Sequence, residues 1–381
     1  MSSKVQKPPL TPETTFCPNF DCPARGQVGE GNIGVHSQKV RRYICHECGT
    51  TFSATRGTLF YRMRKGGDLI VLVVKLLSHG CPIQAIVFAF GLDERTVKNW
   101  LEKSGQHAQK VHEHLVERPR PLGQVQADEL RVKRQGGITW MAMAMIVSTY
   151  LWLGGEVSQQ RDRALIENLI TRVKRCASAL GGAILFCTDG LASYPTVIKD
   201  VFREKEPRQE TGRCRLIEWP NILIAQVIKQ YENNRVIGVT RKIYQGTEEA
   251  VAQVIQQTQG KGDINTAFIE RLNGTFRSYL FSLARRTRSL ARQSKTLHSG
   301  MYLVGCIYNF CTEHESLRLP GLIGGHKWLE RTPAMASDIT DHCWSVQELL
   351  SFKVPPPRWM PIMPRGRPTN AFRAKIARWC K

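Results

Sequence analysis

The spacing of apolar residues along the chain separates a helical part from a part in which strands and helices alternate. Between residues 67 and 114 the apolar positions recur at helical spacing, which predicts helices over Asp68–Ser78, Pro82–Phe90 and Glu94–Ser104. Residues 124–204 instead predict three strands, a helix, a buried strand and a second helix. This alternation is typical of an α/β domain with a mixed β-sheet.

Carboxylates lie in or directly after two of the predicted strands. Gln124–Arg131 contains Asp128 and Glu129, and because neighbouring strand residues point to opposite faces, the alternation alone leaves both as candidates. The buried strand Ala183–Thr188 ends at Asp189, and open α/β sheets bind ligands at the carboxyl ends of their strands. The alternatives are a surface carboxylate on an edge strand and a turn-forming Asp-Gly pair.

Residues 205–262 have the features of an insertion. Ile222–Tyr231 and Arg235–Tyr244 flank Asn233-Asn234, a pair that suits a hairpin turn. Thr247 is the expected N-cap of the helix that follows.

The stretch Asn265–Arg277 predicts a short helix with Glu270 in its middle. Arg277 lies two helical turns after Glu270, and Asn273 flanks the same face. A carboxylate and a guanidinium on one face can hold a divalent cation beside a phosphate. The alternative is a solvated helix whose charges pair with one another. Asp263, seven residues before Glu270, is the other candidate carboxylate.

The charge balance indicates a polyanionic partner. The 381 residues include 54 Lys+Arg and 32 Asp+Glu, a net charge of +22, and contact with phosphates is the strongest general reason for such an excess. An anionic membrane is the competing partner, but the apolar runs are too short or too interrupted to span a bilayer. Because the N-terminus also lacks an apolar signal region, we expect a cytoplasmic, nucleoid-associated protein that binds nucleic acid and no membrane.

Two stretches carry basic residues and no acidic ones. Residues 271–298 include Arg277, Arg285 and Arg286 and adjoin Glu270, so we expect them to contact a nucleic-acid backbone. Residues 353–381 include Arg365-Gly-Arg-Pro368, which resembles an AT-hook that places Arg365 and Arg367 in a minor groove. An ordinary solvated face and a disordered basic tail are the alternatives.

Four of the twelve cysteines form two closely spaced pairs, Cys17 with Cys22 and Cys45 with Cys48. Two tight turns that supply two thiolates each predict a zinc ribbon, since Zn²⁺ favours four soft ligands in a tetrahedron. His36 and His46 are substitute ligands, and four unrelated cysteines are the alternative interpretation.

A glycine-containing turn, residues 91–93, joins the second and third predicted helices. This arrangement predicts a helix-turn-helix, in which side chains at the start of the second helix reach base edges. Those side chains are Arg95, Thr96, Lys98 and Asn99. An ordinary helical hairpin is the alternative.

Asp128, Asp189 and Glu270 come from distant points and can converge at one edge of the sheet. Two-metal phosphoryl transfer needs such a cluster, in which carboxylates hold two ions about 4 Å apart. Ligands that are all oxygen atoms favour Mg²⁺ or Mn²⁺ over Zn²⁺.

The order of these motifs resembles that of the DDE transposases of bacterial and archaeal insertion sequences. It is closest to the group with a zinc ribbon and a helix-turn-helix before an RNase H-like, retroviral-integrase-like catalytic domain. The resemblance covers most of the chain and rests on Gln126-Ala-Asp128-Glu, Thr188-Asp-Gly190 with Tyr194, Ile269–Arg277, and Tyr308–His314.

The resemblance implies that Asp128, Asp189 and Glu270 are catalytic and hold Mg²⁺ or Mn²⁺. In such families the first aspartate lies on the first strand, the second just after the fourth strand, and the glutamate on a later helix. Asn273 and Arg277 are then expected to contact the DNA, Arg277 near the cleaved phosphate.

The expected protein is a DNA transposase that binds the terminal inverted repeats of its element, frees 3′-OH ends and joins them to target DNA. Joining two ends requires at least a homodimer on double-stranded DNA. A DNA-binding regulator derived from a transposase and a metal-dependent nuclease without strand transfer are the alternatives. The predicted parts are a loose tail (1–15), the zinc ribbon (16–56), the helix-turn-helix domain (66–118), the catalytic domain (122–320), a C-terminal extension (321–352) and a basic extended tail (353–381).

Overall fold

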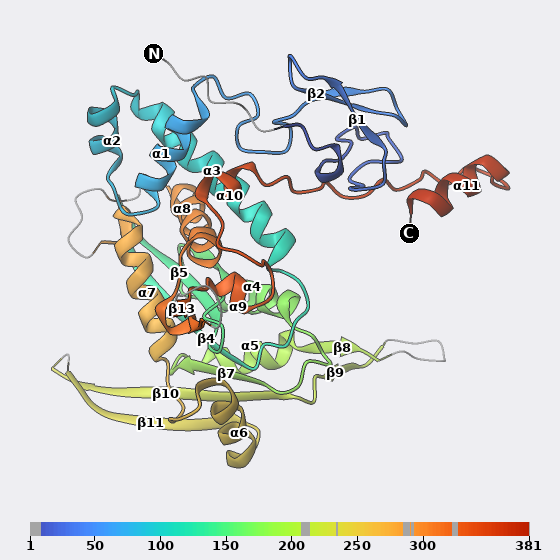
Figure 1. The fold of residues 1–381 in the computed structure, drawn as a ribbon. Helices are drawn as coiled ribbons and strands as arrows, with labels where there is room; N and C mark the ends of the chain where they lie inside the picture. The colour runs from blue at the N-terminus through green and yellow to red at the C-terminus, as the bar shows by residue number, and fades with distance from the viewer. Residues whose placement is uncertain are drawn as a thin grey trace. The chain divides into compact units, whose positions relative to one another are not determined.

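The computed structural model describes residues 9–206, 214–233, 235–284, 290, 293–321 and 327–380 (Figure 1). The chain forms two compact units, one made of residues 1–67 together with 350–381 and the other of residues 68–349. The first unit is therefore discontinuous in sequence. Within the described residues, no helix combines the length and the apolar character needed to cross a membrane.

A three-stranded antiparallel sheet lies at the centre of the discontinuous unit. Its strands are β1 (Ile33–Ser37), β2 (Arg42–Cys45) and β3 (Thr51–Ser53), hydrogen-bonded in that order. Alternate residues of β2 are buried, so Tyr43 and Cys45 share one face of the strand. That face packs into a small core with the other cysteines of the two predicted turns.

The C-terminal segment belongs to this unit, so the extended tail predicted over 353–381 is wrong for its last part. α11 (Asn370–Trp379) ends with Trp379, which is 2% exposed and packs in the same core as the cysteines. The side-chain amide of Gln27 donates to the carbonyl of Trp379 at 3.0 Å. The basic charges of this segment suggested an extended tail, whereas the buried side chain of Trp379 fixes its end.

The N-terminal residues that the structure describes are also packed, although a loose tail was predicted for 1–15. Leu10 is buried in the core of the small unit. The backbone N–H of Thr11 donates to the hydroxyl of Tyr43 at 3.1 Å, and a 3₁₀ turn follows at Pro12–Thr14. Residues 1–8 lie outside the described part of the chain.

Three helices open the second unit: α1 (Gly67–Leu77), α2 (Ile83–Phe90) and α3 (Glu94–Leu115). α2 ends at Gly91, whose φ of 58° is the left-handed conformation that favours glycine. α3 begins after Asp93, whose side chain accepts the N–H groups of the second and third residues that follow. α3 is about twice the predicted length, because buried positions continue through Val111 and His112.

The predicted helix-turn-helix region is not a domain of its own, because α3 packs along α8 (Ser294–Cys306) in the same unit. A β-carbon added at Gly105 of α3 would lie 2.2 Å from the carbonyl oxygen of Ser299 in α8. Glycine at this position is what lets the two helix backbones approach so closely.

A six-stranded mixed sheet forms the centre of the second unit, in the order β11-β10-β7-β4-β5-β6 (Figure 1). The bounds are β4 (Gln124–Arg134), β5 (Gly137–Ile146), β6 (Trp152–Ser158), β7 (Ile184–Asp189), β10 (Ile222–Glu232) and β11 (Arg235–Gln245). β4, β7 and β10 run parallel to one another, and the other neighbours pair antiparallel. The predicted α/β fold with a mixed sheet is confirmed.

The segment predicted to be an insertion supplies part of this sheet. β10 pairs in parallel with β7, with Val227 opposite Asp189. β11 returns beside β10 through the predicted turn, where Asn233 has a φ of 49°. The run of buried residues Ile222–Val227 explains the placement, since a parallel inner strand is apolar on both faces.

The remaining elements cover and connect the sheet. α4 (Arg163–Cys176) packs on β5 and β6, and α7 (Ala267–Tyr279) packs on β4 and β5. α8 continues as a short π-helical turn, Ile307–Cys311. The others are α5 (Ser193–Val201), β8 (Arg203–Lys205), β9 (Leu216–Glu218), α6 (Glu248–Gln259), β12 (Leu319–Pro320), β13 (Trp328–Leu329), α9 (Pro333–Ala336), α10 (Val346–Ser351) and 3₁₀ turns at Phe281–Leu283 and Glu315–Leu317.

Candidate functional site

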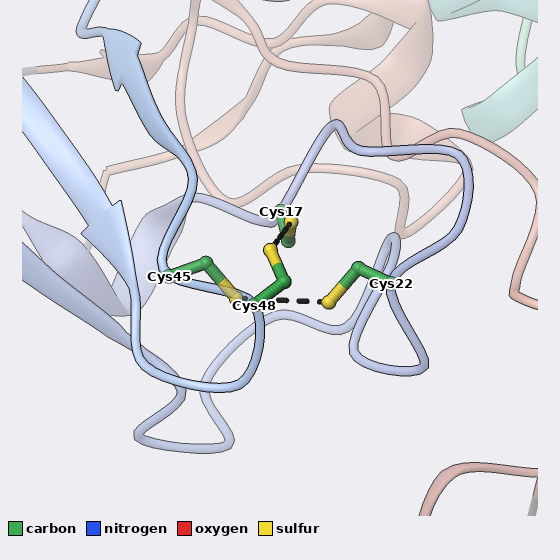
Figure 2. Close-up of side chains that lie close together, drawn as sticks. All are labelled: Cys17, Cys22, Cys45 and Cys48. Atoms are coloured by element: carbon green, nitrogen blue, oxygen red, sulfur yellow. Dashed lines mark hydrogen bonds between the residues drawn. The ribbon is translucent and has the colours of Figure 1, made fainter.

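The four predicted cysteines of the small unit come together, with their side chains directed toward one another (Figure 2). The Sγ atoms of Cys17 and Cys48 lie 3.7 Å apart, as do those of Cys22 and Cys45. The four Sγ atoms all lie within 4.8 Å of one another, and no histidine belongs to the group among the described residues.

Tight backbone turns present these thiols. The N–H of Gly49 donates to the carbonyl of Cys45 at 2.8 Å, and Gly49 has a φ of 68° that favours glycine. In the first pair, Cys22 lies in a tight turn in which the N–H of Arg25 donates to its carbonyl at 3.0 Å. These turns direct the four thiols toward one another.

The donor set fits a thiophilic ion such as Zn²⁺. Sulfur atoms placed about 2.3 Å from a zinc ion at the corners of a tetrahedron are roughly 3.8 Å apart. The two separations of 3.7 Å match that spacing and are far too long for disulfide bonds. His36 and His46, the substitute ligands considered from sequence, are not needed to complete the set.

A second candidate site lies on the sheet of the larger unit, where ligand oxygens of Asp128, Glu129 and Asp189 come within 4.8 Å of one another. β4 and β7 are parallel neighbours, and Ala127 lies opposite Thr188. The next residue on each strand is an aspartate, so the two strands bring Asp128 and Asp189 side by side. These two predicted site residues are brought together as expected.

The two adjacent acidic residues of β4 have different hydrogen-bond partners. Asp128 faces α7, because its Oδ2 accepts a hydrogen bond from Nδ2 of Asn273 at 2.8 Å. Glu129 points to the other side, where the hydroxyl of Tyr194 and the guanidinium of Arg161 donate to it. The two carboxylates therefore have different surroundings, although both approach Asp189.

Gln126 connects this strand to the helix, a role that the sequence analysis did not assign. Its Oε1 accepts the backbone N–H groups of Phe268 and Ile269, each at 3.0 Å. Its Nε2 donates to the carbonyl of Asn265 at 2.8 Å. The side chain thus satisfies N–H groups in the first turn of α7. The sequence signal that could have indicated this role is the position of Gln126, two residues before Asp128 on the same face of the strand.

Glu270 does not belong to this carboxylate cluster. Its Oε1 accepts from the hydroxyl of Thr266 at 2.9 Å and forms an ion pair with Lys229 of β10. Its side chain is 47% exposed. The alternative carboxylate, Asp263, is 74% exposed and pairs with Arg241 at 3.5 Å. The charge of Glu270 contributes to the raised pKa of Asp128.

The electrostatics of the cluster favour a bound cation. Burial, together with the negative charges of Asp189 and Glu129, raises the pKa of Asp128 to about 7. Burial also raises the pKa of Glu129, together with the charge of Asp189, while hydrogen bonds from Tyr194 and Arg161 oppose the shift. Carboxylates that repel one another at a partly dry site are stabilised as anions by a divalent ion.

The predicted DNA contacts lie in different surroundings. At the start of α3, Arg95 and Asn99 are exposed, whereas Thr96 and Lys98 are half-buried and Lys98 pairs with Glu94. Arg365 and Arg367 are exposed on either side of Gly366, which has a φ of 102°.

Asn273, also predicted to contact DNA, is 2% exposed and donates to Asp128. Arg277 is half-buried in the last turn of α7. Arg285 and Arg286 lie outside the described residues.

A scan of protein-family models gave no match to this chain, and a search of curated protein sequences gave none either.

Proposed function

We propose that the chain is a DDE transposase that cleaves the ends of its element and joins them to target DNA. The observation that carries this proposal is the pairing of Asp128 and Asp189 on parallel neighbouring strands, with their ligand oxygens within 4.8 Å. The helix that bears Glu270 is tied to the same strand through Gln126 and Asn273. These contacts support a site in which Glu270 would join Asp128 and Asp189.

The layout of the sheet supports an RNase H-like catalytic domain. Counted along the chain within this sheet, Asp128 lies on the first strand and Asp189 ends the fourth. Glu270 lies on a later helix. This is the order that the resemblance to DDE transposases implies, and β11 adds one strand at the edge.

Asp128 and Asp189 would hold Mg²⁺ or Mn²⁺, and Glu270 would complete the site once it leaves Lys229. Bound Mg²⁺ would polarise the scissile phosphate and lower the pKa of the attacking hydroxyl. The protein's own part is to orient these carboxylates: Asn273 fixes Asp128, and Gln126 fixes the start of α7. A water oxygen would be the nucleophile in cleavage, and the freed 3′-OH the nucleophile in joining.

The zinc ribbon, the N-terminal end of α3 and the exposed arginines near the C-terminus would bind DNA. The net charge of +22 supports this assignment, since each phosphate contact releases counterions. Two ends must be joined in one reaction, so a homodimer or larger assembly is proposed.

The test is strand transfer of labelled DNA from the ends of the element in Mg²⁺. Wild-type protein should cleave and join, whereas Asp128→Asn, Asp189→Asn and Glu270→Ala should bind the ends and fail to cleave. Asp263→Asn is the matched control and should retain activity. Binding without cleavage by the wild type would indicate a regulator, and cleavage without joining a nuclease.

A further inference from the structure

Arg161 links the buried side of the carboxylate cluster to its open side. Its Nε and Nη2 donate to Oε2 of Glu129 at 3.0 and 2.8 Å. The same Nη2 also donates to Oδ2 of Asp189 at 3.0 Å. One planar guanidinium therefore contacts two carboxylates that would otherwise repel each other.

The anchor of this arrangement is Glu129, whose side chain is 0% exposed. It accepts a hydrogen bond from the hydroxyl of Tyr194, itself fully buried in α5. A buried carboxylate must be paired to remain charged, and both of its oxygens are used here. Glu129 is therefore bound on the side of the protein interior and has no oxygen left without a partner.

The position of Arg161 is fixed from two further directions. Its guanidinium lies over the ring of Trp140 in β5, 5.1 Å from the ring centroid. It stands in the short connection between β6 and α4, where the N–H of Gln160 donates to the hydroxyl of Ser158 at 3.1 Å. The side chains of Arg161 and Asp189 are similarly exposed, at 34% and 36%. Arg161 is the partner that the buried Glu129 and the ring of Trp140 hold in addition.

We propose that Arg161 is a positioning residue. Glu129 fixes the guanidinium of Arg161, and Arg161 in turn orients the carboxylate of Asp189 toward Asp128 for cation binding. Glu129 then acts through Arg161 and is not itself a metal ligand. Asp189 keeps its second oxygen, Oδ1, for a cation, and Oδ1 is already oriented by the N–H of Leu191 at 3.1 Å. The inference rests on the proposed function, because it assigns Asp189 to a metal site.

The test has two measurements. Calorimetry measures the binding of Mn²⁺ alone to the full chain, and a cleavage assay measures the Mg²⁺ concentration that gives half the maximal rate of DNA cleavage. Arg161→Gln should weaken Mn²⁺ binding about tenfold and shift the Mg²⁺ requirement equally, as loss of an orienting partner does. The maximal rate at saturating Mg²⁺ should stay within about threefold of wild type, since the ligands remain. Arg161→Lys should give a smaller shift, because an ammonium cannot reproduce the planar fork.

Glu129→Gln should cause the same shift as Arg161→Gln, and the double variant should be no worse than either single one. Arg163→Gln is the matched control: this nearby arginine pairs with Asp200 at 2.6 Å and touches none of the cluster. It should leave Mn²⁺ binding unchanged.

Three results would overturn the proposal: unchanged Mn²⁺ binding in Arg161→Gln, tighter binding, or loss of Mn²⁺ only in Glu129→Gln. Tighter binding would mean that the arginine competes with the cation. Loss restricted to Glu129→Gln would make Glu129 a ligand. A wild-type protein that binds no Mn²⁺ would instead refute the metal site and the proposed function with it.

Discussion

The Oε1 atom of Gln126 accepts the backbone N–H of Ile269 at 3.0 Å, across 143 positions of the chain. This single side chain joins β4 to the first turn of α7. It is fully buried and uses both ends of its amide. The alignment of β4, which carries Asp128, with α7, which carries Glu270, therefore depends on a neutral side chain.

Replacing Gln126 with Ala should lower the free energy of unfolding by roughly 2–4 kcal/mol, because two N–H groups and one carbonyl lose their partner. Chemical denaturation measures the change. Gln84→Ala, at an exposed position of α2, is the control and should change stability little. Equal effects of the two substitutions would show that the amide of Gln126 does not hold α7.

Two glycines should respond to alanine with opposite signs. Gly105→Ala should destabilise the second unit by roughly 1–3 kcal/mol, because the new methyl group would meet the carbonyl of Ser299. Gly274→Ala should stabilise it by up to about 1 kcal/mol, since its β-carbon meets no atom within 4 Å and alanine favours a helix. Thermal unfolding of both variants checks the sign; stabilisation by Gly105→Ala would refute the close contact of α3 and α8.

The buried His107 should make stability depend on pH between about 6.5 and 4. Burial lowers its pKa to about 4, and its neutral ring donates from Nε2 to the carbonyl of Leu349 at 3.1 Å. As pH falls through this window, the unfolded chain binds a proton that the folded chain excludes, so stability is lost.

The measurement compares wild type with His107→Gln, whose side chain does not titrate. The stability advantage of the wild type should shrink by about 1.4 kcal/mol for each pH unit below 6.5. Other titrating groups are common to both proteins and cancel in the difference. An advantage that stays constant down to pH 4 would contradict a neutral, buried His107.

Removing the metal from the cysteine site should unfold the small unit and leave the larger one intact. We expect a core of so few apolar residues to depend on metal binding for its folding free energy. Metal analysis should find one zinc ion per chain, and a chelator should abolish hydrogen-exchange protection in β1, β2 and β3 only. Cys45→Ser should behave like the chelated protein, whereas Cys81→Ser, outside the cluster, should not. A chain with no bound zinc would refute the ribbon interpretation.

The sequence predicted the features that depend on local spacing. The paired cysteines, Asp128 in a strand and Asp189 at a strand end all lie where the pattern placed them. The α/β class followed from the same periodicity.

Features that depend on distant partners were missed. The contacts of Gln126 join residues about 140 positions apart, and no local pattern reports such a pairing. The alternation of residues along the strand did not decide between Asp128 and Glu129. Their surroundings differ because Tyr194 and Arg161, which lie elsewhere in the sequence, donate to Glu129. β10 was assigned to an insertion because the sequence of a buried parallel strand does not indicate which neighbouring strand it pairs with.

The burial of Trp379 also has a consequence for biosynthesis. On the ribosome, the segment that carries the four cysteines emerges before the larger unit, but part of the core around it arrives only after that unit has been made. Residues 68–349 can fold while the cysteine turns still wait for α11. Folding of the larger unit would also shorten the effective loop between the two halves of the small one, which lowers the entropic cost of joining them. A ribosome that stalls before Trp379 would therefore release a chain with a formed carboxylate cluster and an incomplete cysteine unit.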